Sequence, residues 1–294
     1  MLTYEHCMLC PRQCGVNRTE RQLGYCKQPG TMRAARAALH YWEEPVLSGS
    51  YGAGAVFFSG CTLGCLYCQN EQISHENFGK DVSAAQLRET FERLIDEGCQ
   101  SIDLVTPTHF LPSILPALTP KLPVPVIYNC GGYERVETLR ELEGLIDIYL
   151  PDMKYSNAAL ASQLSAAPDY PEVAAAAIEE MYRQVGSAVV KDEIMQRGMI
   201  VRHLVLPGQI DNSLGVLVWF ADAFPRGDVW LSLMSQYIPA GRAKRMPPFD
   251  RTVTEDEYDA VLSYLDLLGI ESGYTQDVTA ARSEYVPVFD LEGL

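Results

Sequence analysis

Short apolar runs alternate with amphipathic segments along most of this chain, and this alternation restricts its possible folds more than any other feature. The runs that predict strands lie at residues 55–59, 101–105, 124–128, 145–150, 199–206 and 229–234. Each is apolar enough to be buried on both faces, as strands of a parallel sheet are. The alternation therefore predicts six right-handed βα units.

Six units are too few to close an eight-stranded barrel. We therefore expect an α/β fold, a partial (β/α)6 TIM-like barrel with an open lateral cleft. Two helices carry a capping box, in which two residues hydrogen-bond each other's backbone N–H. The capping pairs are Ser83 with Gln86 and Thr254 with Glu257. The second helix should end at Gly269, and a long helical region at 157–185 should be broken by its prolines.

Composition and charge exclude several classes of protein. The chain has 294 residues, of which 47% are hydrophobic and 21% charged, which is typical of a globular protein. Its formal net charge of −15 argues against binding to nucleic acid or to an anionic membrane, because clustered Lys and Arg drive such binding. No signal peptide or membrane-spanning run is evident. We expect a cytoplasmic protein whose partners are proteins or small molecules.

The first 45 residues lack the alternation and contain four closely spaced cysteines. We therefore expect an N-terminal Cys-rich metal-binding module at 1–45, followed by the partial-barrel domain at 46–294. Four thiolates fit a coordinatively closed centre, either an iron–sulfur cluster that relays electrons or a zinc ion that folds the segment. The ligands would be Cys7, Cys10, Cys14 and Cys26. Disulfides are disfavoured, because a chain of this length builds its own core and lacks an export signal.

Three further cysteines follow the first predicted strand directly. Cys61, Cys65 and Cys68 lie within eight residues of a Gly-containing loop. A [4Fe–4S] cluster normally takes four cysteines, so three leave one iron with an open position where chemistry can occur. A zinc knuckle would need a fourth ligand such as His75, and would not explain a position at the carboxyl end of a barrel strand. We therefore expect a catalytic [4Fe–4S] cluster on these three cysteines.

Polar residues at the ends of the other strands complete a candidate pocket, because catalytic groups of parallel barrels gather at that edge. They are Thr106, Thr108, His109, Asn129, Asp152, Lys154, His203 and Gln236. Each has an ordinary structural alternative, such as a helix cap, a tight turn or a hydrogen-bonded core residue.

Seven segments together resemble one known family along nearly the whole chain. They are CMLCPRQCGVNR, WEEPVLSG, FFSGCTLGCLYCQN, LVTPTHF, YLPDMKY, VRHLVLPG and SLMSQY. The family is the pyruvate formate-lyase-activating-enzyme-related group of the radical S-adenosylmethionine (SAM) superfamily, similar to glycyl-radical activases. The resemblance implies that SAM chelates the open iron and that one-electron reduction cleaves it to methionine and a 5′-deoxyadenosyl radical, which abstracts hydrogen.

The resemblance also implies roles for individual residues. The aromatic Tyr67 before the third cysteine is part of the cofactor-binding signature. Asp152 and Lys154 resemble an Asp-x-Lys motif that contacts the carboxylate and ribose region of SAM. His203 is expected beside the adenosine or carboxylate, and Gln236 beside the adenine edge.

The chain also departs from true activases. The Gly-Gly-Glu motif that binds the methionine amino group is missing after the second strand, where Thr106, Thr108 and His109 are the candidate replacements. Asn129 stands where some activases place an aspartate that binds a monovalent cation, so a charge is lost there.

We therefore expect an oxidoreductase that abstracts hydrogen from a protein partner, in the manner of a glycyl-radical enzyme activase. Its electron donor would be a flavodoxin or ferredoxin. An alternative is radical SAM modification of a small molecule or peptide, which would require the helical region at 157–185 to close the cleft. A remote alternative is a non-catalytic iron–sulfur electron carrier or zinc-organised adaptor, which predicts no open iron and no affinity for SAM.

Overall fold

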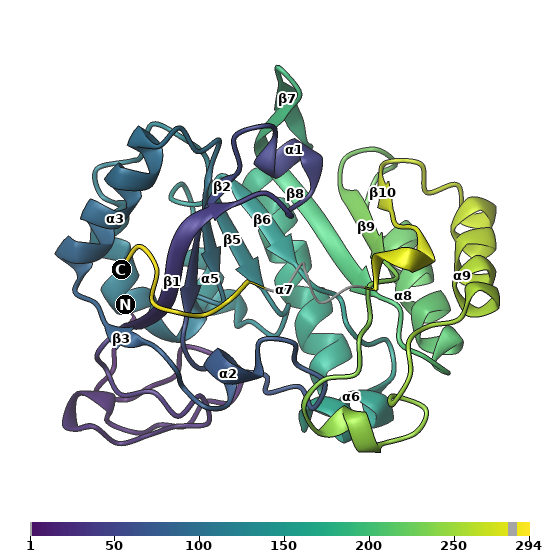
Figure 1. Cartoon of the computed structure of the whole chain (residues 1–294), viewed down its shortest axis with the longest axis horizontal. Coiled ribbons are helices and arrows are strands. Elements are labelled where there is room, and N and C mark those ends of the chain that lie inside the picture. The colour runs from purple at the N-terminus through teal and green to yellow at the C-terminus, as the bar shows by residue number, and fades with distance from the viewer. Residues whose placement is uncertain (1, 282–286) are drawn as a thin grey trace.

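The computed structural model describes residues 2–281 and 287–294, and a ten-stranded sheet forms its centre (Figure 1). The strand order is β10-β9-β8-β6-β5-β4-β2-β1-β3, with β7 paired to β8. The strands are β1 Arg33–His40, β2 Ala53–Phe58, β3 Lys80–Asp81, β4 Ile102–Val105, β5 Val126–Cys130, β6 Ile148–Pro151, β7 Val189–Lys191, β8 Ile194–Leu204, β9 Trp230–Met234 and β10 Gly273–Thr275.

All six expected strands are present, as β2, β4, β5, β6, β8 and β9, and each pairs in parallel with the next. Two features extend the sheet beyond the expectation. β10 adds a parallel strand beside β9, and β1 pairs antiparallel with β2 at the other end. The mostly parallel α/β architecture is thus confirmed, and the parallel set is one strand longer than six units.

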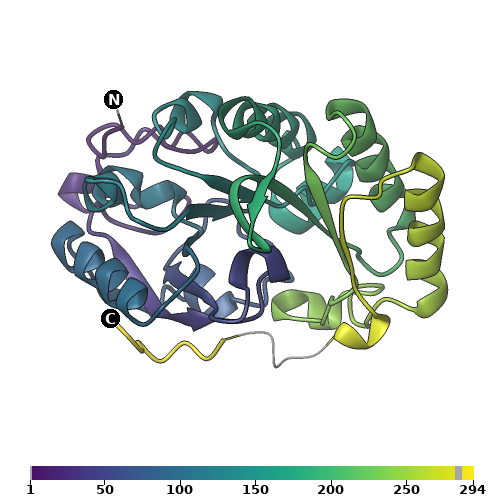
Figure 2. The ribbon, with the colours of Figure 1, turned by 90° about the horizontal axis from the view of Figure 1, so that it is seen from above.

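Most helices cover the outer face of the curved sheet, while the short α1 packs on the inner face. The helices are α1 Pro45–Ser48, α2 Glu71–Ser74, α3 Ala84–Asp96, α4 Leu111–Ile114, α5 Val136–Arg140, α6 Ala158–Ser165, α7 Tyr170–Val185, α8 Ile210–Ala223 and α9 Glu255–Leu268. Short 3₁₀ turns are η1 Arg18–Glu20, η2 Thr108–Phe110, η3 Leu115–Leu118, η4 Gly241–Arg245 and η5 Val278–Ala280. Figures 1 and 2 show α3 and α9 flanking the two ends of the sheet. Among the described residues, no helix has the length and apolar character needed to cross a bilayer.

The predicted helix boundaries are confirmed by their caps. Ser83 Oγ accepts from Gln86 N at 3.2 Å and Gln86 Oε1 accepts from Ser83 N at 2.9 Å. The Thr254–Glu257 box has the same two bonds, at 3.3 and 3.0 Å. Helix α9 ends at Gly269, whose φ of 66° is left-handed. The expected break lies between α6 and α7.

Strands are buried on both faces, as their continuous apolar runs predict. On the outer face, Leu104 and Tyr128 pack in the large core formed with the helices. On the inner, concave face, Ile127, Ile148 and Ile200 pack together with residues of α1. The alternation of side chains along each strand therefore separates an outer core from an inner surface.

The N-terminal module packs on the outer face beside the ends of β4 and β5. Arg135 Nη1 donates to Met8 O at 2.6 Å, and Thr138 Oγ1 donates to Leu9 O at 2.9 Å. Strand β1 falls within residues 1–45 yet pairs with β2. The described residues before β1, 2–32, contain no strand, and the division near residue 45 stays a prediction.

A buried carboxyl group lies in the outer core behind β5. Glu134 is 2% exposed, and its carboxylate accepts hydrogen bonds from Thr108 Oγ1 at 2.8 Å and Tyr128 OH at 3.3 Å. Burial raises the pKa of Glu134 to about 8, from an ordinary value of 4.5. The folded protein therefore keeps a proton on Glu134 that the unfolded chain loses near pH 4.5.

We predict that Glu134 makes the protein less stable as the pH rises from about 4.5 to about 8. Glu134→Gln, which carries no titrating proton, should remove this contribution. The difference in midpoint temperature of thermal unfolding, variant minus parent, should therefore increase as the pH is raised from about 5 to about 8. Anaerobic thermal scans of both proteins across this range measure the difference, and a difference independent of pH would contradict the prediction.

Candidate functional site

The cysteine loop, residues 59–70, begins at the carboxyl end of β2, and each of its three sulfurs accepts a hydrogen bond. The donors are Leu63 N to Cys61 Sγ at 3.3 Å, Ser165 Oγ to Cys65 Sγ at 3.1 Å and Ser74 Oγ to Cys68 Sγ at 3.2 Å. Burial raises the pKa of Cys65 and raises that of Cys68 to about 12, so a free thiol here keeps its proton. Metal binding would release these protons.

Hydrogen bonds to sulfur are one means by which a protein stabilises and tunes an iron–sulfur cluster, so the donor set fits such a group. Among the described residues, no three His, Cys, Asp or Glu side chains converge as ligands of a single metal ion do. In a [4Fe–4S] cluster each cysteine binds a different iron, which spaces the sulfurs farther apart than the ligands of one ion.

Lys154 places a positive charge beside the loop. Its ammonium lies 2.5 Å from Asp152 Oδ2. Burial alone would lower the pKa of Lys154, but the Asp152 carboxylate raises it above its ordinary value, and Cys65 and Cys68 would add to this effect as thiolates. Lys154 therefore remains an ammonium next to two of the three sulfurs. The structure brings together the two parts of the site that sequence separates by more than eighty residues.

Two glycines and a tyrosine hold the Asp152–Lys154 segment in place. Gly132 has a φ of 76°, and a Cβ there would clash with the Asp152 carbonyl oxygen. Tyr170 OH lies 2.8 Å from Gly131 O and accepts from Lys154 N at 2.9 Å. Only glycine permits this close approach between the turn after β5 and the end of β6.

A chain of hydroxyl groups supports the middle cysteine. Tyr155 OH donates to Tyr67 OH at 2.9 Å and lies 2.8 Å from Ser165 Oγ, which donates to Cys65 Sγ. Tyr67 is 6% exposed and packs against Tyr237. The structure therefore places Tyr67 beneath the loop as a packing residue.

Gln236, at the end of β9, joins the far side of the loop. Its carbonyl oxygen accepts from Gln69 Nε2 at 3.3 Å, and its side-chain oxygen accepts from Gln276 Nε2 at 3.1 Å. Thr106 directly follows β4 and has a φ of 59°, a left-handed conformation that is rare for a β-branched residue. Both residues thus lie at the edge where they were expected.

A charged cluster lies on the inner face below this edge. Arg202 pairs with Glu43 and with Glu44, the latter at 2.5 Å. Asn129 Nδ2 donates to Asp103 Oδ2 at 3.2 Å. Burial, together with the Glu43 carboxylate, raises the pKa of Asp103 well above its ordinary value, so Asp103 is neutral. Asn129 therefore connects the inner cluster with the edge that carries the cysteine loop.

Three residues that were expected to contact the cofactor point into the outer core and hydrogen-bond protein groups there, so their role toward SAM stays a prediction. Thr108 hydrogen-bonds Glu134, and His109 Nε2 bonds Ser59 O at 2.7 Å. His203 bonds Met153 O at 2.7 Å and Ser213 Oγ at 2.9 Å. Burial lowers the pKa of His109 to about 3 and that of His203 to about 4. These neutral histidines brace the strand ends.

The four N-terminal cysteines gather in one region. Cys10 lies within electrostatic reach of Cys14 and Cys26, and Cys26 within reach of Cys7 and Cys14. Arg18 Nη1 donates to Cys7 Sγ at 3.7 Å, and Tyr25 N donates to Cys14 Sγ at 3.2 Å. Whether this group holds an iron–sulfur cluster or zinc stays a prediction.

Arg12, between two of these cysteines, clamps the module to the cysteine loop. Its guanidinium donates to Thr62 O at 3.0 Å and to Leu63 O at 3.2 Å. It also donates to Ser165 O at 2.9 Å and to Ala166 O at 2.6 Å at the end of α6. This half-buried guanidinium therefore joins three segments around Cys65: the N-terminal module, the cysteine loop and the end of α6. No role was expected for Arg12 from the sequence, although it lies inside the cysteine motif.

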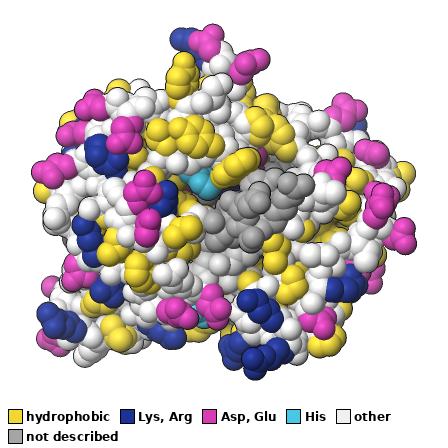
Figure 3. Space-filling view, viewed as in Figure 1, with side chains coloured by type: hydrophobic (Ala, Val, Ile, Leu, Met, Phe, Trp, Pro, Cys, Tyr) yellow, Lys and Arg dark blue, Asp and Glu magenta, His cyan; other side chains and the backbone are white. Residues whose placement is uncertain are grey.

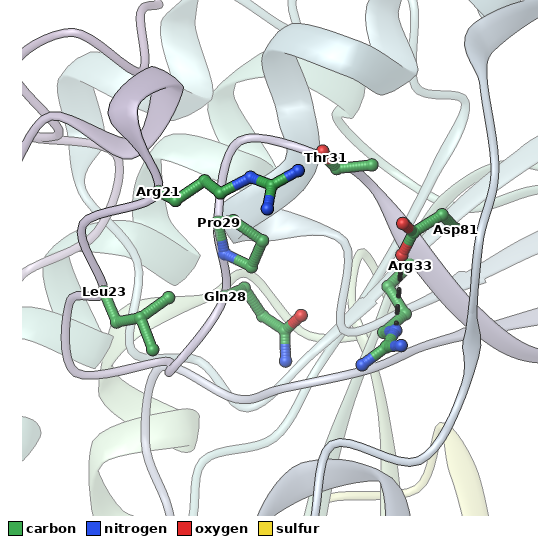
Figure 4. A pocket seen from close by; sticks show the side chains of 7 residues that line it. All are labelled: Arg21, Leu23, Gln28, Pro29, Thr31, Arg33 and Asp81. Carbon is green, nitrogen blue, oxygen red and sulfur yellow. Dashed lines mark ion pairs between the residues drawn. The ribbon is translucent and has the colours of Figure 1, made fainter.

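Two cavities lie away from the cysteine sulfurs. One of about 320 Å³ borders the N-terminal module, where Figure 4 shows Arg33 facing Asp81 across from Arg21. Another of about 430 Å³ lies between the ends of α8 and α9. None of the expected site residues lines either cavity.

Comparison with known proteins supports the assignment of a [4Fe–4S] cluster. Residues 49–110 match a 4Fe-4S single cluster domain. This segment contains all three cysteines of the loop and none of the N-terminal four. The expectation of a [4Fe–4S] cluster is confirmed, while the ligands themselves stay a prediction.

Relatives and solved structures extend the comparison. The uncharacterized protein MJ0674 of Methanocaldococcus jannaschii is 28% identical over 281 residues, which cover 92% of this chain and 77% of that protein. Streptococcus suis SuiB bound to S-adenosylmethionine has a TM-score of 0.52 at 12% identity, covering 76% of this chain and 50% of SuiB. SuiB bound to its precursor peptide SuiA has a TM-score of 0.52 at 10% identity, covering 74% and 46%. This chain thus shares a fold with SuiB and spans about half its length.

We predict that Arg12→Ala weakens retention of the iron–sulfur cluster. Hydrogen bonds from a charged donor contribute roughly 1.5–3 kcal/mol each and are not additive, so the loss should be on the order of 3 kcal/mol. Arg12→Lys should restore little, because an ammonium does not reproduce the fork. Iron and sulfide per chain after anaerobic reconstitution and desalting measure the effect.

Arg135→Ala is the matched control for Arg12, because Arg135 also binds the N-terminal module but does not touch the cysteine loop. This variant should keep its iron content even if its unfolding temperature falls. Equal iron content in the Arg12 and Arg135 variants would contradict a specific clamp.

Proposed function

We propose that this chain is a radical SAM enzyme that holds its catalytic [4Fe–4S] cluster on Cys61, Cys65 and Cys68. The observation that carries the proposal is the combination of three hydrogen-bonded sulfurs with the Lys154 ammonium at the carboxyl edge of a parallel sheet. When bound, the cluster supplies one electron that cleaves SAM to methionine and a 5′-deoxyadenosyl radical.

Lys154 supports this chemistry through its charge. Its ammonium faces the thiolates of Cys65 and Cys68, where it stabilises the negative charge that reduction adds. The same ammonium provides a partner for a carboxylate, the group of SAM that would approach the open iron. Asp152 holds the ammonium in position, and Tyr170 fixes the backbone between them.

The comparisons support this assignment at the level of fold and cluster. The loop falls within the 4Fe-4S domain match, and the parallel sheet resembles that of SuiB, which has been solved with S-adenosylmethionine and with a precursor peptide. The sequence motifs around the cysteines and Asp152 add the resemblance to activating enzymes.

We propose a polypeptide as the substrate, because in the described part of the chain the inner apolar cluster of the concave face is packed by the four-residue helix α1 and by no longer helix. Helix α7 packs on the outer face against β6 and β8, so the region at 157–185 does not close the cleft as a small-molecule enzyme would require. Exposed aromatic side chains lie after β1 and before β2, at the edge of the sheet opposite the cysteine loop: Tyr41 is 52% exposed, Trp42 61% and Tyr51 63%. Figure 3 shows several hydrophobic side chains exposed on this face. Exposed aromatic groups of this kind are typical of surfaces that bind polypeptides.

We predict that the anaerobically reconstituted, reduced protein converts SAM to 5′-deoxyadenosine. A Cys61→Ala, Cys65→Ala, Cys68→Ala variant, with the N-terminal cysteines intact, should form none, because it lacks the open iron. Chromatographic quantification of the product compares the two. Absence of product from a parent whose loop cluster is present and reduced would favour the electron-carrier alternative.

We predict that Lys154→Met lowers the rate of 5′-deoxyadenosine formation by about tenfold to a hundredfold, as loss of groups surrounding a metal site commonly does. The iron content should stay near that of the parent. Lys121→Met is the control, since this exposed ammonium pairs with Asp147 away from the loop. An unchanged rate in Lys154→Met would remove Lys154 from the proposed mechanism.

A further inference from the structure

The 3₁₀ turn η4 carries three cations in four residues of a strongly acidic protein. Arg242, Lys244 and Arg245 are all exposed, and none of their side chains forms a hydrogen bond or ion pair with the described part of the chain. The whole chain has a net charge of −15. Figure 3 shows Lys and Arg side chains gathered at the lower edge of the concave face, where the ribbon of η4 lies in Figure 1.

This turn is bound directly to the cysteine loop. The backbone N–H groups of Arg242 and Ala243 both donate to Leu66 O, at 3.1 and 3.3 Å. Leu66 is the neighbour of Cys65 and lies two positions before Cys68. Gly241 permits this approach, because its φ is 51° and a Cβ there would lie 2.7 Å from Leu66 O. Two backbone hydrogen bonds therefore attach the turn that carries the cations to Leu66, the residue next to the proposed cluster ligand Cys65.

Few carboxylates oppose these cations. Glu71 lies closest to the turn, since a Cβ at Gly241 would be 3.3 Å from its Oε1, and Asp250 is exposed farther along the same loop. Glu255 and Asp256 are exposed beyond this loop, at the start of α9, and Glu257 is already paired with Arg251. The turn is thus a local positive surface on a protein that otherwise repels acidic partners.

We propose that Arg242, Lys244 and Arg245 form the docking surface for an acidic one-electron carrier protein that reduces the cluster. The inference rests on the proposed function, which requires an external reductant. In this step the carrier loses one electron and the cluster gains it, while no bond forms or breaks. The positive charge of the docking surface favours a carrier with an acidic surface. The hydrogen bonds to Leu66 place the docked carrier next to the cluster ligands.

Stopped-flow measurement of cluster reduction, followed by its visible absorbance, tests the proposal on the reconstituted full chain without SAM. The probes are a reduced acidic [2Fe–2S] ferredoxin and photoreduced 5-deazaflavin, a small reductant that needs no docking. The variant is Arg242→Gln, Arg245→Gln. At low ionic strength its reduction by ferredoxin should be about tenfold slower than that of the parent, and the difference should vanish at high salt. Reduction by deazaflavin should be unchanged.

Lys191→Gln, Arg197→Gln is the matched control, because it removes the same two charges from the exposed hairpin of β7 and β8 at the opposite end of the molecule. It should behave as the parent. Equal slowing in both variants, or slowing with deazaflavin as well, would overturn the docking surface. The assay contains no SAM, so it tests the docking surface independently of SAM cleavage. If Arg242→Gln, Arg245→Gln slows reduction by ferredoxin while the parent forms no 5′-deoxyadenosine, the proposed function is refuted and the docking surface is retained.

Discussion

Parallel pairing of β2, β4, β5 and β6 is the constraint on which the rest of the structure depends. Parallel strands end at a common edge, so the cysteine loop, the Gly131–Gly132 turn and the Asp152–Lys154 segment meet although they are far apart in sequence. The close approach at Gly132 and the Tyr170 hydrogen bonds then fix their spacing. The meeting of these three segments at one edge follows from this parallel pairing.

Charge is distributed around this edge in a definite pattern. Lys154 supplies one cation beside the sulfurs, and Arg12 supplies another that binds loop carbonyls from the N-terminal module. Below the edge, Arg202 is matched by Glu43 and Glu44. Lys154 and Arg12 therefore place two cations against the cysteine loop, a suitable environment for a cluster that gains negative charge on reduction.

Local sequence signals predicted much of this structure. The six strands, both capping boxes and the end of α9 at Gly269 follow from short-range patterns, and the cofactor follows from cysteine spacing. The side of the sheet to which each individual side chain points could not be predicted from these patterns. Adjacent strand residues point to opposite sides, and a strand buried on both faces gives no polarity signal to separate them. Arg202 therefore lies on the inner face, while the expected ligand His203 lies in the outer core.

Long-range contacts were equally invisible in the sequence. The Arg12 clamp joins residues separated by about fifty and about one hundred and fifty positions, and Thr108 turns toward Glu134 because of how β4 and β5 pack. Propensity and periodicity carry no information on such pairs. The N-terminal module has little regular structure, so only its cysteine spacing was informative.

The central claim is that the three-cysteine loop leaves one iron open to SAM. The most direct test is electron–nuclear double resonance on the reduced cluster with SAM labelled with ¹⁷O in its carboxylate. A hyperfine coupling to the label, absent when Cys61, Cys65 and Cys68 are replaced by Ala, is the result that this account predicts. A reduced loop cluster whose spectrum shows no coupling to saturating labelled SAM would contradict it.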